Sequence, residues 1–499
     1  MPRNIIILGG GTAGWMAANL FVKQWPADKV RVTLIESPDI GIVGVGEGST
    51  PTLKRFFEML AIPEREWMPR CNATYKLNIR FEDWSPESGL KSYSHPFTSQ
   101  VDTFTHGPFT RNCHSRRLGL NVHTRPDDFF LNGLLAAERK GPQRPDSFPF
   151  VIEYGYHFDS GLLGEYLSEV AVDRGATHVQ ARIVEARTDE SGALTTLVAD
   201  DGVEHAADFF VDCTGFASVL MGKTLGVGFK SFADNLFNDS AVVMPTPREG
   251  TLPAETVAYA MQCGWRWKIP LTHRFGNGYV YSSDFISHDD AEAEFRASLG
   301  MLDSDTEARR LRMRVGQLEQ HWHRNCLGLG LSQGFIEPLE ATALHLVQIS
   351  IELFMTLYEK GQFSDEHART YNEKIDARFE RVRDYIVAHY KLNTRDDTDY
   401  WKANRANMTL SNSLRHILDV WYRRGDLNQE IQRQKIESHF GTASWHCLLA
   451  GYGAFPPLAG EQPEGRDLYE KQSVRDFLAG CSLNFAAHED NLAALDTGS

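Results

Sequence analysis

A short apolar run, a glycine-rich turn and a segment with helical periodicity follow one another at the N-terminus. Residues 4–8 are apolar, Gly9-Gly10-Gly11-Thr12-Ala13-Gly14 comes next, and apolar positions then recur with helical spacing over 15–25. Glycines in the spacing G-x-G-x-x-G let the backbone turn sharply and approach a pyrophosphate, which the N–H groups of the following helix can bind. The segment predicts a dinucleotide-binding fold, with an ordinary tight turn as the alternative.

Two later segments support this prediction. A second apolar strand, 30–35, ends at Glu36, about twenty residues beyond Gly14, where the motif requires a partner for ribose hydroxyls. Predicted strands at 178–188 and 194–200, joined by a turn at 190–192, precede a buried strand that ends in Asp212-x-Thr214-Gly215. A strand with this end resembles the second nucleotide-contact segment of flavin proteins, which favours FAD over NAD.

The composition limits the classes of function. A chain of 499 residues can form two or three domain-sized cores. A net charge of −15 argues against nucleic acid and an anionic membrane surface as partners. The seven cysteines lack C-x-x-C spacing and the histidines lack metal-ligand spacing, so we expect reduced thiols, a cytoplasmic location and no metal. Polar residues within 341–358 predict a buried helix rather than a membrane span.

The N-terminal half contains further predicted elements. Alternating glycines over 41–51 predict a loop that approaches a ligand closely, and 52–60 has a helical pattern. Apolar and polar residues alternate over 75–81, which predicts a half-buried strand with Lys76 on its polar face. From the pattern alone, Lys76 is a solvated surface lysine. We expect 85–155 to form long loops and short helices of a substrate region.

The remaining pattern changes from mixed to helical. It predicts a helix over 160–172, strands at 256–262 and 279–285, and a strand, irregular turn and helix over 312–343. Further helices are expected at 364–391 with Ser364 as N-cap, and at 409–424, 426–438 and 471–484, whereas the last fifteen residues look frayed. The fold class is therefore α/β, an FAD-binding dinucleotide (glutathione-reductase-like) fold with mixed sheets. Residues 1–345 would form the FAD-binding module, 70–155 would contribute to the substrate region, and 346–499 would complete it as a mainly helical region.

One short motif is far more specific than the glycine turn. Trp265-x-Trp267-x-Ile269-Pro270, together with the glycine motif, resembles the flavin-dependent halogenases of the tryptophan halogenase family. The resemblance includes 62–67, 278–283 and 335–340, and it covers residues 4 to 460, most weakly at the C-terminal end. It implies an FADH2-dependent halogenase that receives reduced FAD from a separate flavin reductase. Oxygen and a halide ion, bromide or chloride, then give hypohalous acid, which travels through a tunnel to a lysine beside the aromatic substrate.

The resemblance also implies the roles of individual residues. The lysine matches Lys76, which would hold hypohalous acid by a hydrogen bond or as a haloamine, and a dry tunnel would favour its neutral amine. The carboxylate matches Glu340, which would stabilise positive charge on the ring or accept its proton; Glu337 is the second choice, and a helix N-terminal acid is the plain structural alternative. The residues expected to contact FAD are Gly9, Gly10, Gly11, Thr12, Ala13, Gly14, Glu36, Gly46, Glu47, Gly48, Ile183, Gly215, Leu331 and Leu344.

The halide site is implied at backbone N–H groups that match Thr342 and Ala343. Family members usually have Ser-Thr-Gly after the glutamate, whereas this chain has Ala341-Thr342-Ala343, so a methyl group replaces a hydrogen at 343. This change makes a close fit to chloride less certain and favours bromide. Trp265 and Trp267 would lie near the flavin and keep the organic substrate away from it; without the motif they would be core aromatics on one face of a strand.

The substrate-facing aromatics match His95, Phe97 and Phe440. Tryptophan-specific relatives carry tyrosines and an acid in a longer segment before this last position, whereas 426–440 is shorter here and lacks tyrosine. We therefore expect an indole-like small aromatic substrate rather than tryptophan. Two alternatives are an FAD-dependent two-component aromatic monooxygenase and a flavin-binding protein without turnover. The sequence is compatible with a homodimer.

Overall fold

The computed structural model describes residues 2–39, 46–436, 440–462 and 471–496. The chain forms two compact units, and each unit is assembled from three separate segments. The first unit consists of Met1–Asn72, Phe158–Ala233 and Met313–Glu380, and the second of Ala73–His157, Asp234–Arg312 and Arg381–Ser499. All seven cysteines are free thiols. Within the described ranges, no helix is long and apolar enough to cross a bilayer.

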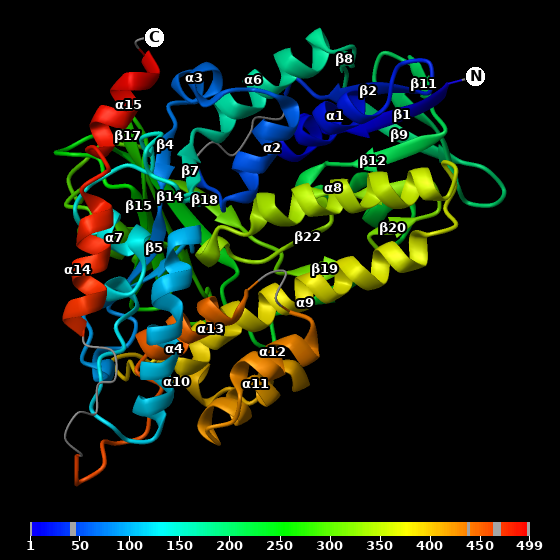
Figure 1. Cartoon of the computed structure of the whole chain (residues 1–499). Coiled ribbons are helices and arrows are strands. Elements are labelled where there is room, and N and C mark those ends of the chain that lie inside the picture. Colours follow the sequence, from blue (N-terminus) through cyan, green and yellow to red (C-terminus); the bar gives the residue numbers. More distant parts are fainter. Residues whose placement is uncertain (1, 40–45, 437–439, 463–470, 497–499) are drawn as a thin grey trace. The chain divides into compact units, whose positions relative to one another are not determined.

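The first unit is built on a six-stranded sheet in the order β20-β21-β12-β1-β2-β8 (Figure 1). Adjacent strands pair in parallel except for β20 and β21, which are antiparallel. This is the sheet of a dinucleotide-binding fold, as the N-terminal pattern predicted. The strands are β1 Arg3–Leu8, β2 Val30–Glu36, β8 Thr177–Gln180, β12 Phe209–Asp212, β20 Trp322–His323 and β21 Cys326–Gly328.

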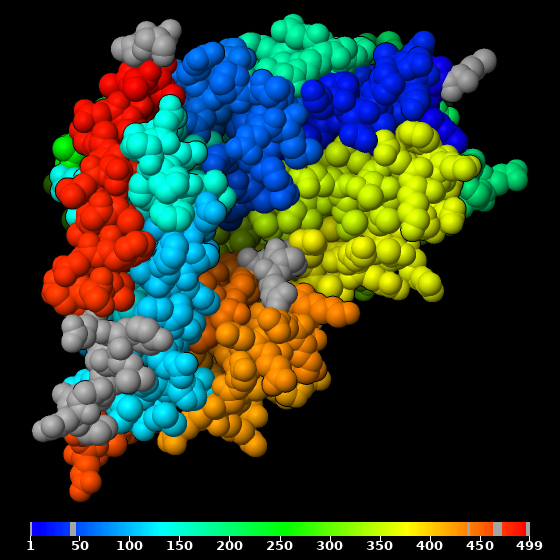
Figure 2. All heavy atoms as spheres, viewed as in Figure 1, coloured from blue at the N-terminus to red at the C-terminus, as the bar shows by residue number. Residues whose placement is uncertain are grey.

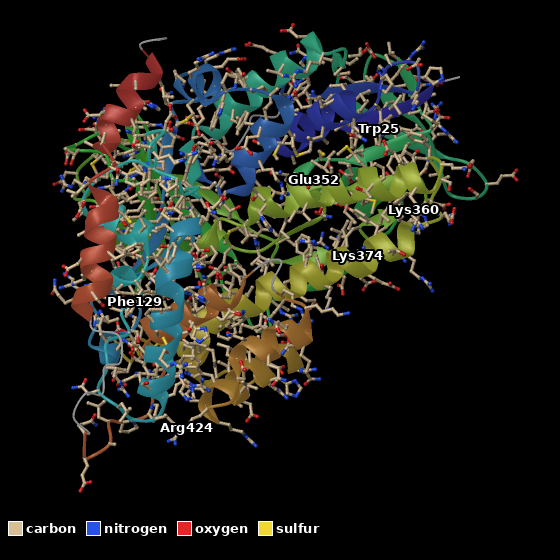
Figure 3. The ribbon with its side chains drawn as sticks, in the orientation of Figure 1. Trp25, Phe129, Glu352, Lys360, Lys374 and Arg424 are labelled. Carbon is tan, nitrogen blue, oxygen red and sulfur yellow. The ribbon has the colours of Figure 1, made fainter. Side chains whose placement is uncertain are left out.

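Helices α1 (Thr12–Gln24) and α8 (Ala343–Lys360) pack against each other in this unit. At the end of α1, Trp25 Nε1 donates a hydrogen bond of 2.6 Å to Glu359 Oε1 on α8. Figure 3 labels Trp25 and Lys360, the last residue of α8. The apolar residues of α1 from Trp15 to Phe21 are buried, which explains their helical spacing in the sequence. The unit also contains α2 Thr52–Leu60, α3 Glu64–Trp67 and α6 Ser160–Asp173.

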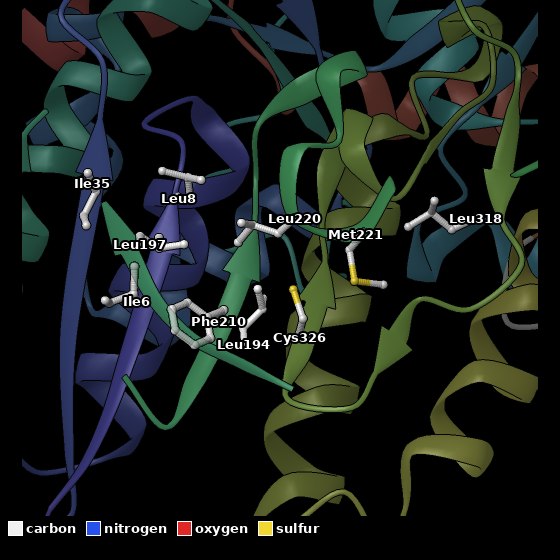
Figure 4. Close-up of a cluster of buried hydrophobic side chains, with 10 residues drawn as sticks. All are labelled: Ile6, Leu8, Ile35, Leu194, Leu197, Phe210, Leu220, Met221, Leu318 and Cys326. Atoms are coloured by element: carbon white, nitrogen blue, oxygen red, sulfur yellow. The ribbon is translucent and has the colours of Figure 1, made fainter. Parts of the chain in front are cut away.

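A hydrophobic core joins the large sheet to a smaller antiparallel one (Figure 4). Ile6 and Leu8 of β1 and Phe210 of β12 contact Leu194 and Leu197 of the three-stranded meander. The meander consists of β9 Ile183–Thr188, β10 Leu194–Ala199 and β11 Glu204–Ala206. The predicted strand 178–188 is therefore two strands in different sheets. A further small sheet contains β13 Phe229–Ser231, β19 Gly316–Leu318 and β22 Gly334–Phe335.

The second unit is built on a seven-stranded sheet in the order β18-β14-β17-β16-β15-β5-β6. All pairs are antiparallel except β15 and β5. Helix α7 (His288–Ser298) packs on β14 and β17. The strands are β5 Asn78–Glu82, β6 Ser92–Pro96, β14 Ser240–Pro247, β15 Glu255–Met261, β16 Gly264–Pro270, β17 Arg274–Tyr281 and β18 Arg309–Arg312.

Helices complete the second unit. Helices α11 and α12, in orange in Figure 2, lie against each other at the surface, and α9 (Ala368–Leu392) continues from the first unit into the second. The others are α4 Thr103–Arg117, α5 Leu131–Ala137, α10 Asp399–Ala406, α11 Asn412–Tyr422, α12 Leu427–Gln434, α13 Thr442–Gly451, α14 Lys471–Ser482 and α15 His488–Asp496.

Several sequence predictions about elements are wrong. The predicted strand 75–81 is two strands, β4 (Thr74–Lys76) and β5, and the strand predicted at 279–285 is β17, which ends at Tyr281. Ser364 donates to the Gly361 carbonyl and lies before α9, which begins at Ala368, so it is not the N-cap. The fraying expected over the last fifteen residues is wrong for His488–Asp496, which form α15.

Candidate active site

The glycine turn brings the backbone close to the end of β2. Gly9 has a φ of +115°, and a Cβ there would lie 2.3 Å from the Cys213 carbonyl oxygen. A Cβ on Gly10 would lie 1.6 Å from Glu36 Oε2. Gly11 caps α1 in an extended conformation with no side-chain hydrogen bond, and the space around its α-carbon is open. These residues fit a bound pyrophosphate, because among the described residues neither a side-chain cap nor a covering side chain occupies the helix N-terminus at Gly11.

Glu36 lies where the ribose-binding acid is expected. Its carboxylate covers Gly10, and Oε1 is 2.7 Å from His178 Nε2 at the start of β8. His178 also makes an edge contact with Trp15 of α1, at 5.0 Å between ring centroids. Sequence reasoning missed His178, since its position depends on the parallel pairing of β2 with β8.

Asp212 organises the turn that is expected to be the second nucleotide contact. Its fully buried carboxylate accepts hydrogen bonds from Thr214 N and Oγ1 at 3.0 and 2.6 Å, and from the N–H groups of Leu220 and Met221 at 2.8 Å each. The turn leaves Gly215 at a φ of +65° with open space around it. A carboxylate held by four donors makes this turn rigid.

The other residues expected to contact the cofactor differ in their exposure to solvent. The turn at Gly215 packs against the turn at Gly330–Ser332, where Leu331 is exposed, and Gly330 approaches Ala13. The structure thus brings these two turns and the glycine motif together. Leu344 is buried in α8, whereas Ile183 lies on β9 and packs beside the core.

Glu47 is a titratable group beside the start of α6. Desolvation by burial raises its pKa to about 7, a hydrogen bond with Ser160 lowers it, and the negative charge of Asp159 raises it further. Gly46 precedes it with a φ of +76°, and Gly48 follows in the short strand β3 (Glu47–Gly48). The preceding part of the predicted loop, 41–45, lies outside the described residues.

Both candidate glutamates lie just before α8, and the candidate halide site lies at its start. Glu337 and Glu340 are buried, and Ala341 adopts a φ of +55°. Thr342 is the N-cap, and its carbonyl accepts the Leu346 N–H at 3.0 Å. The N–H groups at the start of an α-helix have no partners within the helix and carry partial positive charge, so they suit an anion.

In the second unit, Lys76 has no exposed surface. The reading as a solvated lysine is therefore wrong, and the whole run from Tyr75 to Ile79 is buried rather than half-buried. Lys76 Nζ lies 5.5 Å from the centroid of the Phe97 ring. A buried amine beside an aromatic face meets the requirement for a lysine shielded from water.

Two of the aromatics expected to face the substrate, His95 and Phe440, are linked by a residue that sequence reasoning missed. Tyr385 of α9 stacks on Phe440 at 3.6 Å between centroids, and its ring lies 5.8 Å from that of His95. The rings of His95 and Phe440 are 6.3 Å apart. The helical spacing of Tyr385 with its apolar neighbours marked only a core position.

Trp265 and Trp267 project from the same face of β16, with their ring centroids 5.9 Å apart. Both are buried, and the Trp267 ring lies over Gly278 of β17, where a Cβ would clash with it. Within the described part of the chain, Trp267 Nε1 has no hydrogen-bond partner.

Comparison with known proteins decides the family. The sequence model of the family described as "Tryptophan halogenase" matches residues 4–463. The chain belongs to the tryptophan halogenase family. It is 38% identical to tryptophan 6-halogenase SttH of Streptomyces toxytricini, over 95% of each chain. It is 33% identical to tryptophan 7-halogenase RebH of Lentzea aerocolonigenes, over 91% of this chain and 90% of RebH.

Solved structures agree with this assignment. The crystal structure of SttH superimposes with a TM-score of 0.85 and 34% identity, covering 99% of this halogenase and 100% of SttH. BrvH, a flavin-dependent halogenase from Brevundimonas sp. BAL3, gives a TM-score of 0.83 and 31% identity, covering 99% of each chain. The predicted family, the FAD-binding fold and the class of FADH2-dependent halogenases are therefore confirmed.

Proposed function

We propose that this halogenase forms hypohalous acid with reduced FAD, O2 and a halide ion, and that the acid passes through a tunnel to Lys76 for electrophilic halogenation of an indole-like aromatic ring. A separate flavin reductase would supply FADH2. When bound, FADH2 would supply electrons to O2, and the partly reduced oxygen would then oxidise the halide. The observation that carries the proposal is the complete burial of Lys76 beside Phe97.

Two reactions of Lys76 are consistent with this environment. The amine can donate a hydrogen bond to hypohalous acid, which polarises the oxygen–halogen bond. Alternatively it attacks the halogen, so that an N–halogen bond forms, the O–halogen bond breaks and water leaves. In both cases the halogen is transferred as an electrophile to a ring carbon, and the ring then loses a proton. Fixed orientation beside Lys76 would select one carbon.

Glu340 is the proposed acceptor of the ring proton. A carboxylate can stabilise the positive charge that develops on the ring and then remove the proton as a general base. Burial of Glu340 supports this role, because electrostatic interactions are stronger away from water. Glu337, which is equally enclosed, remains the second choice.

The acids before Phe440 support an indole over tryptophan. Asp426 caps α12 by accepting the Gln429 N–H, and Glu430 accepts hydrogen bonds from Arg433 and Gln434. Those bonds lower the pKa of Glu430 to about 2. These two carboxylates are thus engaged locally. The third acid of the segment, Glu437, lies outside the described residues, and the segment offers no tyrosine to an amino-acid group. Burying a zwitterion without partners is unfavourable.

We propose bromide as the preferred halide. Bromide is less strongly hydrated than chloride, so it loses less on entering a site away from water, and it is easier to oxidise. At the proposed halide N–H groups, Ala343 replaces the glycine usual in the family, which alters the close fit to chloride. Competition at equal concentrations should give mostly brominated product, and mostly chlorinated product would contradict this preference.

The decisive assay supplies FAD, a flavin reductase, NADH and bromide with indole, and separately with L-tryptophan. Mass spectrometry should show the bromine isotope doublet, with a higher kcat/KM for indole. A product that gains oxygen without bromine would instead indicate the monooxygenase. Unchanged substrate with both compounds would indicate a flavin-binding protein without turnover on either of them.

A further inference from the structure

Strand β4, which ends with Lys76, pairs with β7 (Gly155–Phe158) in the second unit. Thr74 lies opposite His157, and Lys76 lies opposite Gly155. His157 is fully buried. Burial is the main cause that lowers the pKa of His157 well below its ordinary value, and positive charge on Lys76 or His488, when either is protonated, lowers it further. The imidazole beside the lysine is therefore neutral.

The hydrogen bonds of His157 define its tautomer. Thr74 Oγ1 donates to the Pro270 carbonyl at 2.7 Å and lies 3.0 Å from His157 Nδ1. A hydroxyl has one proton, so the Thr74 oxygen must accept from Nδ1–H. His157 Nε2 then accepts from Thr256 Oγ1 at 2.9 Å. This chain of bonds connects the Lys76 strand to the end of the W-x-W-x-I-P motif.

His488 of α15 holds the same strand from another side. Its Nε2 lies 3.2 Å from the backbone N of Tyr75, and its Nδ1 lies 3.0 Å from the Leu252 carbonyl. A backbone N–H can only donate, so Nε2 accepts and Nδ1–H donates. Burial lowers the pKa of His488 to about 4, so this ring is also neutral near pH 7.

We infer that His157 and His488 are positioning residues for Lys76, which fix its strand through two neutral imidazoles of the same tautomer. Neither ring needs to touch the substrate. His157 acts through the hydroxyl of Thr74, two residues before Lys76. His488 acts through the N–H of Tyr75, one residue before it. The inference rests on the proposed role of Lys76. Small displacements of a reacting group can lower a rate by up to about a hundredfold.

The test uses amides that replace one nitrogen of each ring. Asparagine can put an N–H at the Nδ1 position, and glutamine can put an oxygen at the Nε2 position. His157→Asn keeps the donor to Thr74, whereas His157→Gln loses it. For His488 the order reverses, because His488→Gln keeps the acceptor for Tyr75 and His488→Asn loses it. The expected pattern is crossed, because asparagine is tolerated at 157 and glutamine at 488. Each variant keeps one of the two hydrogen bonds of its histidine, so effects on packing and stability alone predict no such crossed pattern.

With FAD, reductase, bromide and indole, we expect His157→Asn and His488→Gln to stay within about threefold of the wild-type kcat. His157→Gln and His488→Asn should lose about tenfold or more in kcat, with the KM for indole unchanged. If the two variants at each histidine lost kcat equally, in proportion to their loss of Tm, the inference would be overturned. Lys76→Ala is assayed in parallel: if it still brominates indole, the proposed function fails, whereas an inactive Lys76→Ala with no crossed pattern refutes only the positioning role.

Discussion

Lys76 is an ionisable side chain without exposed surface, so its replacement should separate stability from activity. Exchange of a buried ionisable group for an apolar side chain of similar volume is often neutral or stabilising, by about 1–4 kcal/mol in favourable cases. We therefore expect Lys76→Met to abolish halogenation while the free energy of unfolding stays equal or rises. Urea unfolding and product analysis would measure both.

Lys268 provides the control for this substitution. It lies on β16, half-buried, with Nζ 4.1 Å from the centroid of the Phe275 ring. Lys268→Met removes a similar cation–aromatic contact and should keep bromination. If Lys76→Met brominated indole at the wild-type rate, hypohalous acid would be acting as a free oxidant.

The two buried glutamates before α8 can be distinguished by amide substitution. Glu340→Gln removes the proposed general base with little change of shape, so the halogenation rate should fall by about 10²–10⁴-fold. Glu337→Gln, three residues earlier and equally enclosed, should stay near the wild-type rate. Single-turnover product formation decides between them, and the reverse order would assign the base to Glu337.

At this scale, the sequence predicted residue types better than their surroundings. The glycine motif pointed to Glu36 by its spacing, whereas Lys76 was implied only by the family resemblance. The alternation around Lys76 suggested a solvated side chain, because it could not reveal a break after β4 or a histidine 413 residues away from Tyr75. Tyr385 was missed for the same reason, since its contacts with Phe440 and His95 depend on the folded chain.

Among the elements, the first turn of α8 carries the main departure from the family pattern. Ala343 is its first residue and is half-buried. Ala343→Gly removes the methyl group beside the proposed halide N–H groups, so the ratio of chlorinated to brominated product should rise. Halide competition measures this ratio. Ala368→Gly, at the first residue of α9, is the matched control and should leave it unchanged.

The loop that contains Glu47 should make stability depend on pH. The folded pKa of Glu47, about 7, lies above its ordinary 4.5 because burial disfavours the charged form. The folded state therefore binds more protons between these values, and the contribution to stability is lost as pH rises through about 7. We expect Glu47→Gln to raise Tm at pH 8.5 more than at pH 5. The exposed Glu58→Gln is the control, and equal shifts would contradict the assignment.

Regular elements with strong periodicity were predicted closely, as the match of 52–60 with α2 shows. Helix α4 was not expected as a fifteen-residue element, because Gly107 and Pro108 lower its helical propensity. Buried Phe109 and Cys113 pack it in place. Strand β16 follows its pattern, since Trp265 and Trp267 are more buried than the intervening Arg266.

For the whole molecule, buried neutral histidines predict sensitivity to acid. Burial lowers the pKa of His345, His446 and His488 to about 4 and that of His321 to about 3, from an ordinary 6.5. The unfolded chain binds these protons first, so the free energy of unfolding falls as pH drops from about 6.5 towards 4.

Buried carboxyls act in the opposite direction in this range. Burial raises the pKa of Glu47 to about 7 and that of Asp102 to about 6, and it also raises those of Glu82 and Glu294. Among the described residues, burial also lowers the pKa of His106, His114, His157 and His323, so eight histidines against four carboxyls leave a net loss of stability in acid. Urea midpoints at pH 7.5, 6.5 and 5.5 should decrease in that order, and a constant midpoint would contradict the prediction.

The assembly of each unit from three separate segments has a consequence for synthesis on the ribosome. The first unit needs α8 and the strands near residue 322 beside β12, so its sheet stays incomplete until residues up to about 360 have emerged. The second needs His488, which binds the strand begun at Thr74. Neither unit can fold to completion as a nascent N-terminal fragment. Much of the apolar surface of both units therefore stays unburied, and accessible to chaperones, until the last segments are synthesised.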